Sequence, residues 1–228
     1  MQQPKAHGPD ISHHQDVAGP RDPAWVLGSA KCSEGQQSGD REFLKHWEWL
    51  EGIKYRGAYH WLRSDSPIAA QANNVVKRVR EANGSRDLLR GDMIQNDWEV
   101  TPGIPLVTHA QVQEFNDRVR QAFSEDCVIT YSSDWLPDST LDLDSVAEFL
   151  QWRWINPTEP LWYANYNTGA GPTGGWAECL QYRADVWQWT SKYVHPSIVS
   201  SSGGFDMNHV FNFATLDRIC RRVPITPP

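Results

Sequence analysis

The sequence reads YRGAYHWL at residues 55–62, SPIAAQANNVVKRVREANG at residues 66–84 and DMIQNDWE at residues 92–99. The first and third stretches are short and rich in aromatic and aliphatic residues, which is typical of β-strands. The middle stretch begins with Ser66-Pro67, where proline favours the first turn of a helix, and ends at Asn83-Gly84. The order strand, helix, strand predicts a β-α-β unit with parallel strands.

The same alternation continues on both sides of this unit. Six more stretches are expected to be strands: Gly8–Ser12, Ala24–Lys31, Cys127–Ser132, Leu161–Tyr166, Asp185–Thr190 and Phe205–Asn208. Two more helices are expected at Thr108–Ser124 and Asp144–Trp154. Their apolar residues recur at spacings that place them on one side of a helix. These residues are Val112, Phe115, Val119 and Phe123 in the first helix, and Val146, Phe149, Leu150 and Trp154 in the second.

Eight strands in one domain predict an α/β fold, namely an irregular (β/α) barrel similar to the TIM barrel. We expect the second half of the barrel to be distorted, because Gly169–Gly175 reads as a loop where a helix would be due. A doubly wound open sheet is the alternative. It is less favoured because no G-x-G-x-x-G motif follows the first strand.

The expected domain spans residues 8–223, between a loose leader at residues 1–7 and a tail or the start of a linker at residues 224–228. The chain has 21 Lys and Arg against 28 Asp and Glu, which gives a formal charge of −7. This acidic balance, without a basic run, disfavours nucleic-acid binding. No stretch approaches the roughly 18 apolar residues of a membrane span. We therefore expect neither a nucleic-acid nor a membrane partner, and we expect a monomer.

Cysteines are few and widely spaced, at Cys32, Cys127, Cys179 and Cys220. No C-x-x-C motif is present, so a zinc ribbon or a thioredoxin-like site is not expected. The first twenty residues lack the apolar segment of a secretory signal. Buried free thiols are therefore favoured over disulfides.

Acidic residues stand where three of the expected strands begin or end. In a barrel, the loops after the carboxyl ends of the strands carry the site, and these acids are Asp10, Asp97, Glu99 and Asp206. Because side chains alternate along a strand, Asp97 and Glu99 point the same way. Their carboxyl groups can approach to about 5 Å, which suits a retaining glycosidase pair. A D-x-E motif alone is weak, since a solvated strand end has the same pattern.

Aromatic residues strengthen the case for a sugar cleft. The chain has 12 Trp against 3 Met, and Trp is costly as plain core filler because its N–H needs a partner when buried. Six aromatic residues near strand ends are candidates for lining the subsites, although each could equally belong to the core: Tyr59, Tyr131, Trp162, Tyr166, Trp187 and Trp189. A serine nucleophile is disfavoured, because no G-x-S-x-G elbow is present.

The chain resembles glycoside hydrolase family 25, the lysozymes that act as N-acetylmuramidases. The resemblance runs from about Gly8 to Val210. It rests on a set of short motifs in a fixed order: Asp10-Ile-Ser-His-His-Gln15, Lys31-Cys-Ser-Glu-Gly35, Arg56-Gly-Ala-Tyr-His60, Asp97-Trp-Glu99, Tyr131-Ser-Ser133, Leu161-Trp-Tyr-Ala-Asn-Tyr166, Trp187-Gln-Trp-Thr-Ser191 and Phe205-Asp-Met-Asn208. The resemblance implies an irregular (β/α) barrel and an acidic set on Asp10, Asp97, Glu99 and Asp206.

By this resemblance, the chain would cleave the β-1,4 bond between N-acetylmuramic acid and N-acetylglucosamine in bacterial peptidoglycan, without a cofactor. Glu99 is expected to be the general acid, because a neighbouring carboxylate and an apolar pocket both raise its pKa. Asp97 would either attack the anomeric carbon or orient the 2-acetamido group that attacks instead. The resemblance favours the second route, and both retain configuration. Asp10 and Asp206 would hold the pair by hydrogen bonds.

Two other functions would each account for part of the sequence. His13, His14 and His60 lie near Asp10 at strand ends, as in a metal-dependent amidase or deacetylase of peptidoglycan. Their spacing matches no H-E-x-x-H motif, so no metal is expected. A non-catalytic carbohydrate-binding module would explain the tryptophans but not the clustered acids. The missing signal segment favours a phage endolysin, made in the cytoplasm and released to act on the cell wall, although a secreted enzyme remains an alternative.

Overall fold

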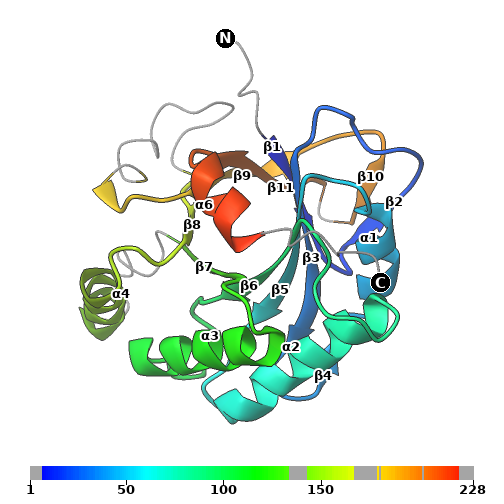
Figure 1. The fold of residues 1–228 in the computed structure, drawn as a ribbon. Coiled ribbons are helices and arrows are strands. Elements are labelled where there is room, and N and C mark those ends of the chain that lie inside the picture. Colours follow the sequence, from blue (N-terminus) through cyan, green and yellow to red (C-terminus); the bar gives the residue numbers. More distant parts are fainter. Residues whose placement is uncertain (1–6, 134–142, 167–178, 180, 202, 221–228) are drawn as a thin grey trace.

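A closed barrel of eight strands forms the centre of the protein (Figure 1). The computed structural model describes residues 7–133, 143–166, 179, 181–201 and 203–220. The barrel strands are β1 (His7–Ile11), β3 (Leu27–Glu34), β5 (Tyr55–Trp61), β6 (Asp92–Asp97), β7 (Val128–Ser133), β8 (Leu161–Ala164), β9 (Val186–Tyr193) and β11 (Phe205–Val210). Strand β1 pairs with β11 on one side and with β3 on the other, which closes the barrel. The predicted barrel is therefore confirmed, and the open-sheet alternative is wrong.

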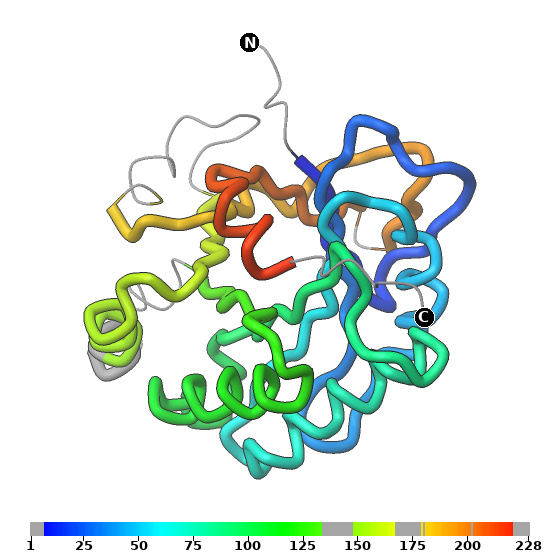
Figure 2. Tube along the Cα trace, viewed as in Figure 1, coloured from blue at the N-terminus to red at the C-terminus, as the bar shows by residue number. Residues whose placement is uncertain are grey.

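One strand of the barrel runs against the others. Neighbours from β3 to β9 are parallel, whereas β11 is antiparallel to both β9 and β1. In Figure 2 the blue trace of β1 lies beside the orange trace of β11. Because β11 is reversed, its first residues lie at the end of the barrel where the parallel strands finish. The register places Asp206, the second residue of β11, opposite Asp10.

Of the described helices, four flank the barrel on the side of β3 to β7, and a fifth lies over one end of it (Figure 1). The outer helices are α1 (Phe43–Trp49), α2 (Ile68–Ala82), α3 (His109–Phe123) and α4 (Leu143–Ile155). Helix α3 begins at a capping box, in which Thr108 and Gln111 bond each other's backbone N–H groups. A short helix, α6 (Phe213–Ile219), lies across the end where the parallel strands start. The opposite end, where these strands finish, is left for the acidic residues.

Three short strands lie outside the barrel proper. Strand β4 (Ser38–Gly39) pairs with the end of β3. Strands β2 (Gln15–Val17) and β10 (Ile198–Ser200) pair with each other. This pairing joins the segment after β1 to the connection between β9 and β11.

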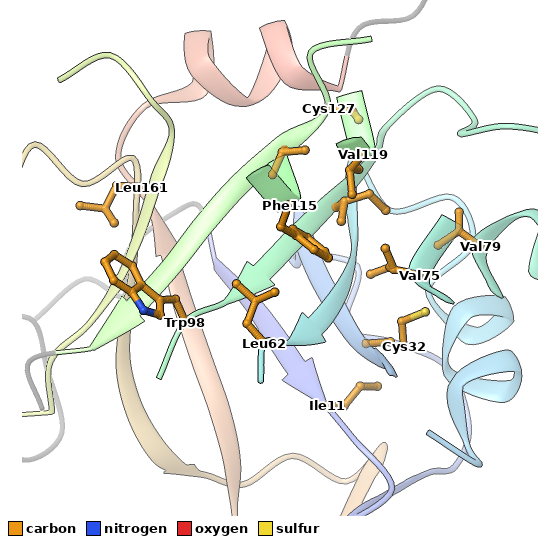
Figure 3. Close-up of a cluster of buried hydrophobic side chains, with 14 of the residues drawn as sticks. Ile11, Cys32, Leu62, Val75, Val79, Trp98, Phe115, Val119, Cys127 and Leu161 are labelled. Atoms are coloured by element: carbon orange, nitrogen blue, oxygen red, sulfur yellow. The ribbon is translucent and has the colours of Figure 1, made fainter. Parts of the chain in front are cut away.

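Apolar residues form two layers, one on each side of the barrel wall. The outer layer lies between the strands and the helices, where Phe115 and Val119 of α3 approach Val75 and Val79 of α2 (Figure 3). The inner layer fills the barrel at the end where the parallel strands start, and α6 covers it. Its members include Leu27, Met93, Ile129, Val186, Val210, Leu216 and Ile219. Toward the opposite end of the barrel, where the parallel strands finish, the inward-facing residues are polar. The candidate site lies at this end.

Some predicted boundaries differ from the structure. Strand β3 begins at Leu27 instead of Ala24 and continues to Glu34, because the polar residues after Lys31 still pair with β5. Strand β1 begins at His7, inside the segment predicted as a leader. The sequence reading missed α1 and α6, two helices of seven residues each. The predicted tail at 224–228 and the loop at 169–175 lie outside the described residues.

Helix α4 exists as predicted, but its predicted buried side is wrong. Phe149 and Trp152 are fully buried, whereas Trp154 is 86% exposed and Leu150 is 46% exposed. At about 100° per residue, Trp152 lies on the same side as Phe149, and Trp154 is turned about 140° away from Phe149. The side chain of Val146 lies outside the described residues.

All four cysteines are buried. Cys32 and Cys127 are buried free thiols, as predicted, and burial raises the pKa of each to about 12. Within the described part of the chain, no helix has the length and apolar content that crossing a membrane requires.

Candidate active site

Four acidic side chains meet at the end of the barrel opposite α6. Asp97 is the last residue of β6, and Glu99 lies two residues beyond it. Asp10 and Asp206 face each other across the β1–β11 pairing and share a side-chain hydrogen bond. Glu99 exerts an electrostatic effect on both Asp97 and Asp206, and Asp10 acts on Glu99 in turn. All four acids predicted from the sequence are therefore close together.

The extended backbone continues past the end of β6, and this sets the direction of Glu99. The Trp98 N–H donates to the Tyr131 carbonyl at 3.0 Å. Asn96 and Trp98 point out of the barrel: the Asn96 amide donates to Thr130 Oγ1 at 3.1 Å, and the Trp98 indole donates to the Val107 carbonyl at 2.8 Å. Asp97 and Glu99 therefore point inward together, as the alternation of side chains predicts.

Burial gives this pair unusual affinity for a proton. Burial raises the pKa of Glu99 to about 7. Burial and the nearby charge of Glu99 raise the pKa of Asp97 well above its ordinary value. The Lys31 ammonium acts in the opposite direction on both carboxyls. Because two close carboxylates resist being ionised together, the pair retains a proton near neutral pH.

Asp10 is held differently, by two side-chain amides. Its Oδ2 atom accepts from Gln188 Nε2 at 2.6 Å and from Asn208 Nδ2 at 2.9 Å. The Trp162 indole N–H donates to Asn208 Oδ1 at 2.8 Å, which fixes the orientation of that amide. Sequence reasoning missed Gln188 and Asn208 as site residues. The signal was present in the strand alternation, since Asn208 stands two residues after Asp206 on the same strand.

Three of the predicted aromatic residues lie at the acids. Tyr59, Asp10 and Asp206 line a cavity of about 220 Å³. The hydroxyls of Tyr131 and Tyr166 both donate to Gln188 Oε1. Burial and the neighbouring carboxylates raise the pKa of all three tyrosines, so they stay neutral.

Of the predicted tryptophans, Trp162 reaches the acids only through Asn208, whereas Trp187 and Trp189 lie away from them. Trp162 and Trp187 are fully buried, so neither presents a ring face to solvent. Trp187 stacks on Phe211, with ring centroids 6.1 Å apart, and Trp189 packs edge-on against Tyr193. Since Gln188 points inward, its neighbours Trp187 and Trp189 point outward, and the structure does not bring them to the acids. Trp61, which the predicted set omits, lies beneath the Lys31 ammonium at 4.6 Å from its ring centroid.

The three histidines considered for a metal site do not come together: the ring centroids of His13 and His14 lie 4.1 Å apart, but His60 is elsewhere. His60 is fully buried outside the barrel, between Ser33 Oγ and Gln71 Oε1, and burial lowers its pKa to about 4. His13 bonds Asp40 at 2.7 Å, and only His14 reaches the cavity beside Asp10. Across the described residues, no group of three or more His, Cys, Asp or Glu side chains is arranged to hold a metal ion.

Comparison with protein families agrees with this geometry. The sequence pattern of the family described as glycosyl hydrolases family 25 matches residues 10–198. The chain belongs to glycosyl hydrolase family 25. Family 25 membership confirms the resemblance seen in the sequence and the prediction that this protein is a glycoside hydrolase. No curated protein sequence matches the chain.

Solved structures share the family 25 fold at low sequence identity. A bacterial lysozyme from Streptomyces coelicolor superposes with a TM-score of 0.69 at 18% identity, over 96% of this chain and 98% of that one. The catalytic domain of an endolysin from a bacteriophage of Listeria monocytogenes gives 0.66 at 20% identity, over 96% and 99%. A family 25 lysozyme from Aspergillus fumigatus gives 0.64 at 22% identity, over 94% and 98%.

Proposed function

We propose that this family 25 protein is an N-acetylmuramidase, which cleaves the β-1,4 bond between N-acetylmuramic acid and N-acetylglucosamine in bacterial peptidoglycan. The observation that carries the proposal is the Asp97–Glu99 pair, which retains a proton near neutral pH. The lysozymes, muramidases and endolysins that share the fold support the choice of substrate.

Glu99 supplies the proton that the leaving oxygen needs. Its pKa of about 7 keeps a large fraction of the carboxyl protonated at neutral pH, while the acid is still strong enough to give the proton up. As the glycosidic bond breaks, positive charge develops at the anomeric carbon. The Glu99 carboxylate that remains can then accept a proton from the incoming water.

Asp97 orients the 2-acetamido group of the sugar whose bond is cleaved. Its Oδ1 atom accepts no hydrogen bond from the described residues, and in the proposed complex the acetamido N–H donates to the Asp97 carboxylate. The acetamido oxygen then attacks the anomeric carbon and forms an oxazolinium ion, which water opens with net retention of configuration. With the proton of the pair on Glu99, the Asp97 carboxylate is ionised and stabilises this ion. Asp10 and Asp206 fix the far side of the site, and Tyr59, Tyr131 and Tyr166 contact the sugar.

Each barrel contains the whole acidic set, so a monomer is sufficient for this chemistry. The proposal places the enzyme at the cell wall, reached by phage-mediated release or by secretion. Bacterial peptidoglycan is its partner.

The test is mass spectrometry of digested peptidoglycan after borohydride reduction. A muramidase leaves chains that end in reduced N-acetylmuramic acid. Chains ending in reduced N-acetylglucosamine indicate a glucosaminidase, free stem peptides an amidase, and an unchanged wall a binding module. Parallel digestion after dialysis against EDTA should proceed at the same rate, whereas a loss restored by zinc would favour the metal-dependent class.

A further inference from the structure

A groove on the outside of the barrel lies along helix α3, which contacts α4 (Figure 1). Its volume is about 640 Å³, against about 220 Å³ for the cavity beside the four acids. One wall is a stripe along α3 from His109 to Gln121, and the other is the end of α4 at Ile155 together with Asn156. Twelve residues of helix span about 18 Å, so this α3–α4 groove is long enough for an extended chain.

Exposed apolar side chains lie at the end of α4 that forms this wall. Ile155 lines the groove and is 55% exposed, and the preceding residue, Trp154, is 86% exposed. Leu150 stands one turn before Trp154 on the same side of α4 and is 46% exposed. Neighbouring exposed apolar side chains that are bordered by polar residues are typical of a binding surface. The proposed cleavage reaction gives these three residues no role.

The charged lining of the groove selects the chemistry of its ligand. Glu114 and Asp117 present carboxylates, and the Arg118 guanidinium donates to Glu114 at 2.8 Å. His109 Nδ1 lies 2.6 Å from a carboxylate oxygen of Glu148. Both basic side chains are thus engaged by acids, and the acidic balance repels a polyanion such as a nucleic acid. Carboxylate oxygens only accept hydrogen bonds, so the groove suits a neutral ligand that is rich in O–H and N–H donors.

We propose that the α3–α4 groove, with Trp154 at its edge, is a second glycan-binding site, which holds a strand of peptidoglycan outside the active site. The C–H face of a pyranose ring is weakly positive and complements the negative face of the indole. The hydroxyl and acetamido N–H groups of the same sugar complement the carboxylates of the groove. The identity of the glycan rests on the proposed function. A second contact of this kind keeps the enzyme at the wall, because it raises the local concentration of substrate at the acids.

The first test is co-sedimentation with insoluble peptidoglycan, in Glu99→Gln protein so that the wall stays intact. Adding Trp154→Ala should weaken binding about two- to tenfold, which corresponds to the loss of one aromatic contact. Trp154→Phe keeps an aromatic face and should retain most of the binding. Leu44→Ala is the matched control, because Leu44 is 59% exposed on α1, away from the groove, and it should bind like the parent. Unchanged binding in Trp154→Ala, or an equal loss in Leu44→Ala, would overturn the second site.

Kinetics with Glu99 restored separate the groove from the active site. On a soluble fragment of two disaccharides, Trp154→Ala should keep the kcat/KM of wild type, because the cleaved molecule needs only the acids. On intact wall the same variant should require a higher concentration of wall for half-maximal rate, by about the same two- to tenfold factor as in sedimentation. An equal loss on both substrates would place the effect of Trp154 at the acids and overturn the second site.

A direct titration does not depend on catalysis. Chitotetraose, a neutral oligomer of N-acetylglucosamine, is added to ¹⁵N-labelled Glu99→Gln protein, and the indole N–H signal of Trp154 is assigned by its loss in Trp154→Ala. We expect this signal to shift to saturation, and an unmoved signal would overturn the second site.

Two further outcomes keep the alternatives apart. A dimer in sedimentation velocity that dissociates in Trp154→Ala would make the groove a contact between copies of this chain and would also overturn the second site. A shifted Trp154 signal without muramidase products from the active enzyme would refute the proposed function alone. Muramidase products with an unmoved signal and unchanged wall binding would refute the second site alone.

Discussion

The Asp97–Glu99 pair and the Asp10–Asp206 pair bring four carboxyls to one end of the barrel by different routes. The first pair comes from a single strand end, where two residues of extended backbone place both groups on one side. The second pair comes from the first and last strands of the barrel, through an antiparallel register. The two pairs also differ in their neighbours. Hydroxyls and an ammonium surround Glu99, whereas two amide N–H groups converge on Asp10.

This difference indicates a division of tasks between like groups. Burial raises the pKa of Asp10 and the two amide donors oppose that rise, whereas burial and the Asp10 charge raise the pKa of Asp206 well above its ordinary value, so the proton of the second pair rests on Asp206. The first pair has no amide donor among the described contacts. Its proton is therefore the exchangeable one, as general acid catalysis needs.

The largest expected effect comes from Glu99→Gln. The amide has nearly the same shape but cannot give up a proton, so the rate of wall cleavage should fall by at least about 10²–10⁴-fold. Circular dichroism and the unfolding transition should show an intact fold. Activity within tenfold of wild type would mean that Glu99 is not the general acid. It would also contradict the proposed division of tasks between the two pairs.

Asp97→Asn should cost somewhat less, about 10²–10³-fold, because it removes the charge that stabilises the oxazolinium ion and keeps the shape. The decisive measurement uses cell wall whose amino sugars are de-N-acetylated, beside re-acetylated wall. Wild type should cleave only the re-acetylated sample, since the acetamido oxygen is the nucleophile. Equal rates on both walls would make Asp97 itself the nucleophile.

A matched pair of variants tests which member of the second pair is the anion. Asp10→Leu leaves the amides of Gln188 and Asn208 without their shared acceptor, and each unsatisfied buried donor costs about 1–3 kcal/mol. Asp206→Leu removes one hydrogen bond and leaves the Asp10 anion with both amides. Denaturant unfolding at pH 7 should therefore show the larger loss of stability for Asp10→Leu. The reverse order would place the anion on Asp206.

The smallest expected effect is on stability as a function of pH. Burial raises the pKa of Glu99 from an ordinary 4.5 to about 7 in the folded state. Between these values the folded protein binds the proton more tightly, so this contribution is complete below about pH 4.5 and is lost as pH rises through 7. Glu99→Gln carries no such proton. Wild type and Glu99→Gln should melt at similar temperatures near pH 4.5, and Glu99→Gln should melt a few degrees higher at pH 8. If the melting temperatures of wild type and Glu99→Gln differed by the same amount at every pH, the pKa of Glu99 would not be raised in the folded protein.

The sequence predicted the barrel and its acids because both depend on local patterns. Short apolar stretches and strand alternation are local, and they placed Asp97 beside Glu99. The end of β3 was missed because Ser33 and Glu34 are polar and read as a loop, although they pair with β5. The seven-residue helix α1 was missed, although Phe43, His46 and Trp47 are buried at helical spacing.

The tryptophans could not be assigned from sequence, because a buried indole and a sugar platform have the same local pattern. Trp187 and Trp189 flank an inward glutamine, and only the direction of Gln188 reveals that they face outward. The contact of Gln188 with Asp10 joins residues separated by 178 positions. The Asp10–Asp206 pair likewise depends on the antiparallel insertion of β11 beside β1, and no local sequence pattern predicts that direction.

The reversed last strand also has a consequence for when the enzyme becomes competent. Asn208 and Asp10 are 198 positions apart and meet only when β11 inserts between β9 and β1. Contacts between such distant segments form late in folding, since a long loop must be closed before they contribute. The strands before β11 can pair first, with Asp97 and Glu99 already in place at the end of β6, while the Asp10–Asp206 pair has not yet formed. Hydrolytic competence would then wait for β11, because the set of four carboxyls is complete only in the closed barrel.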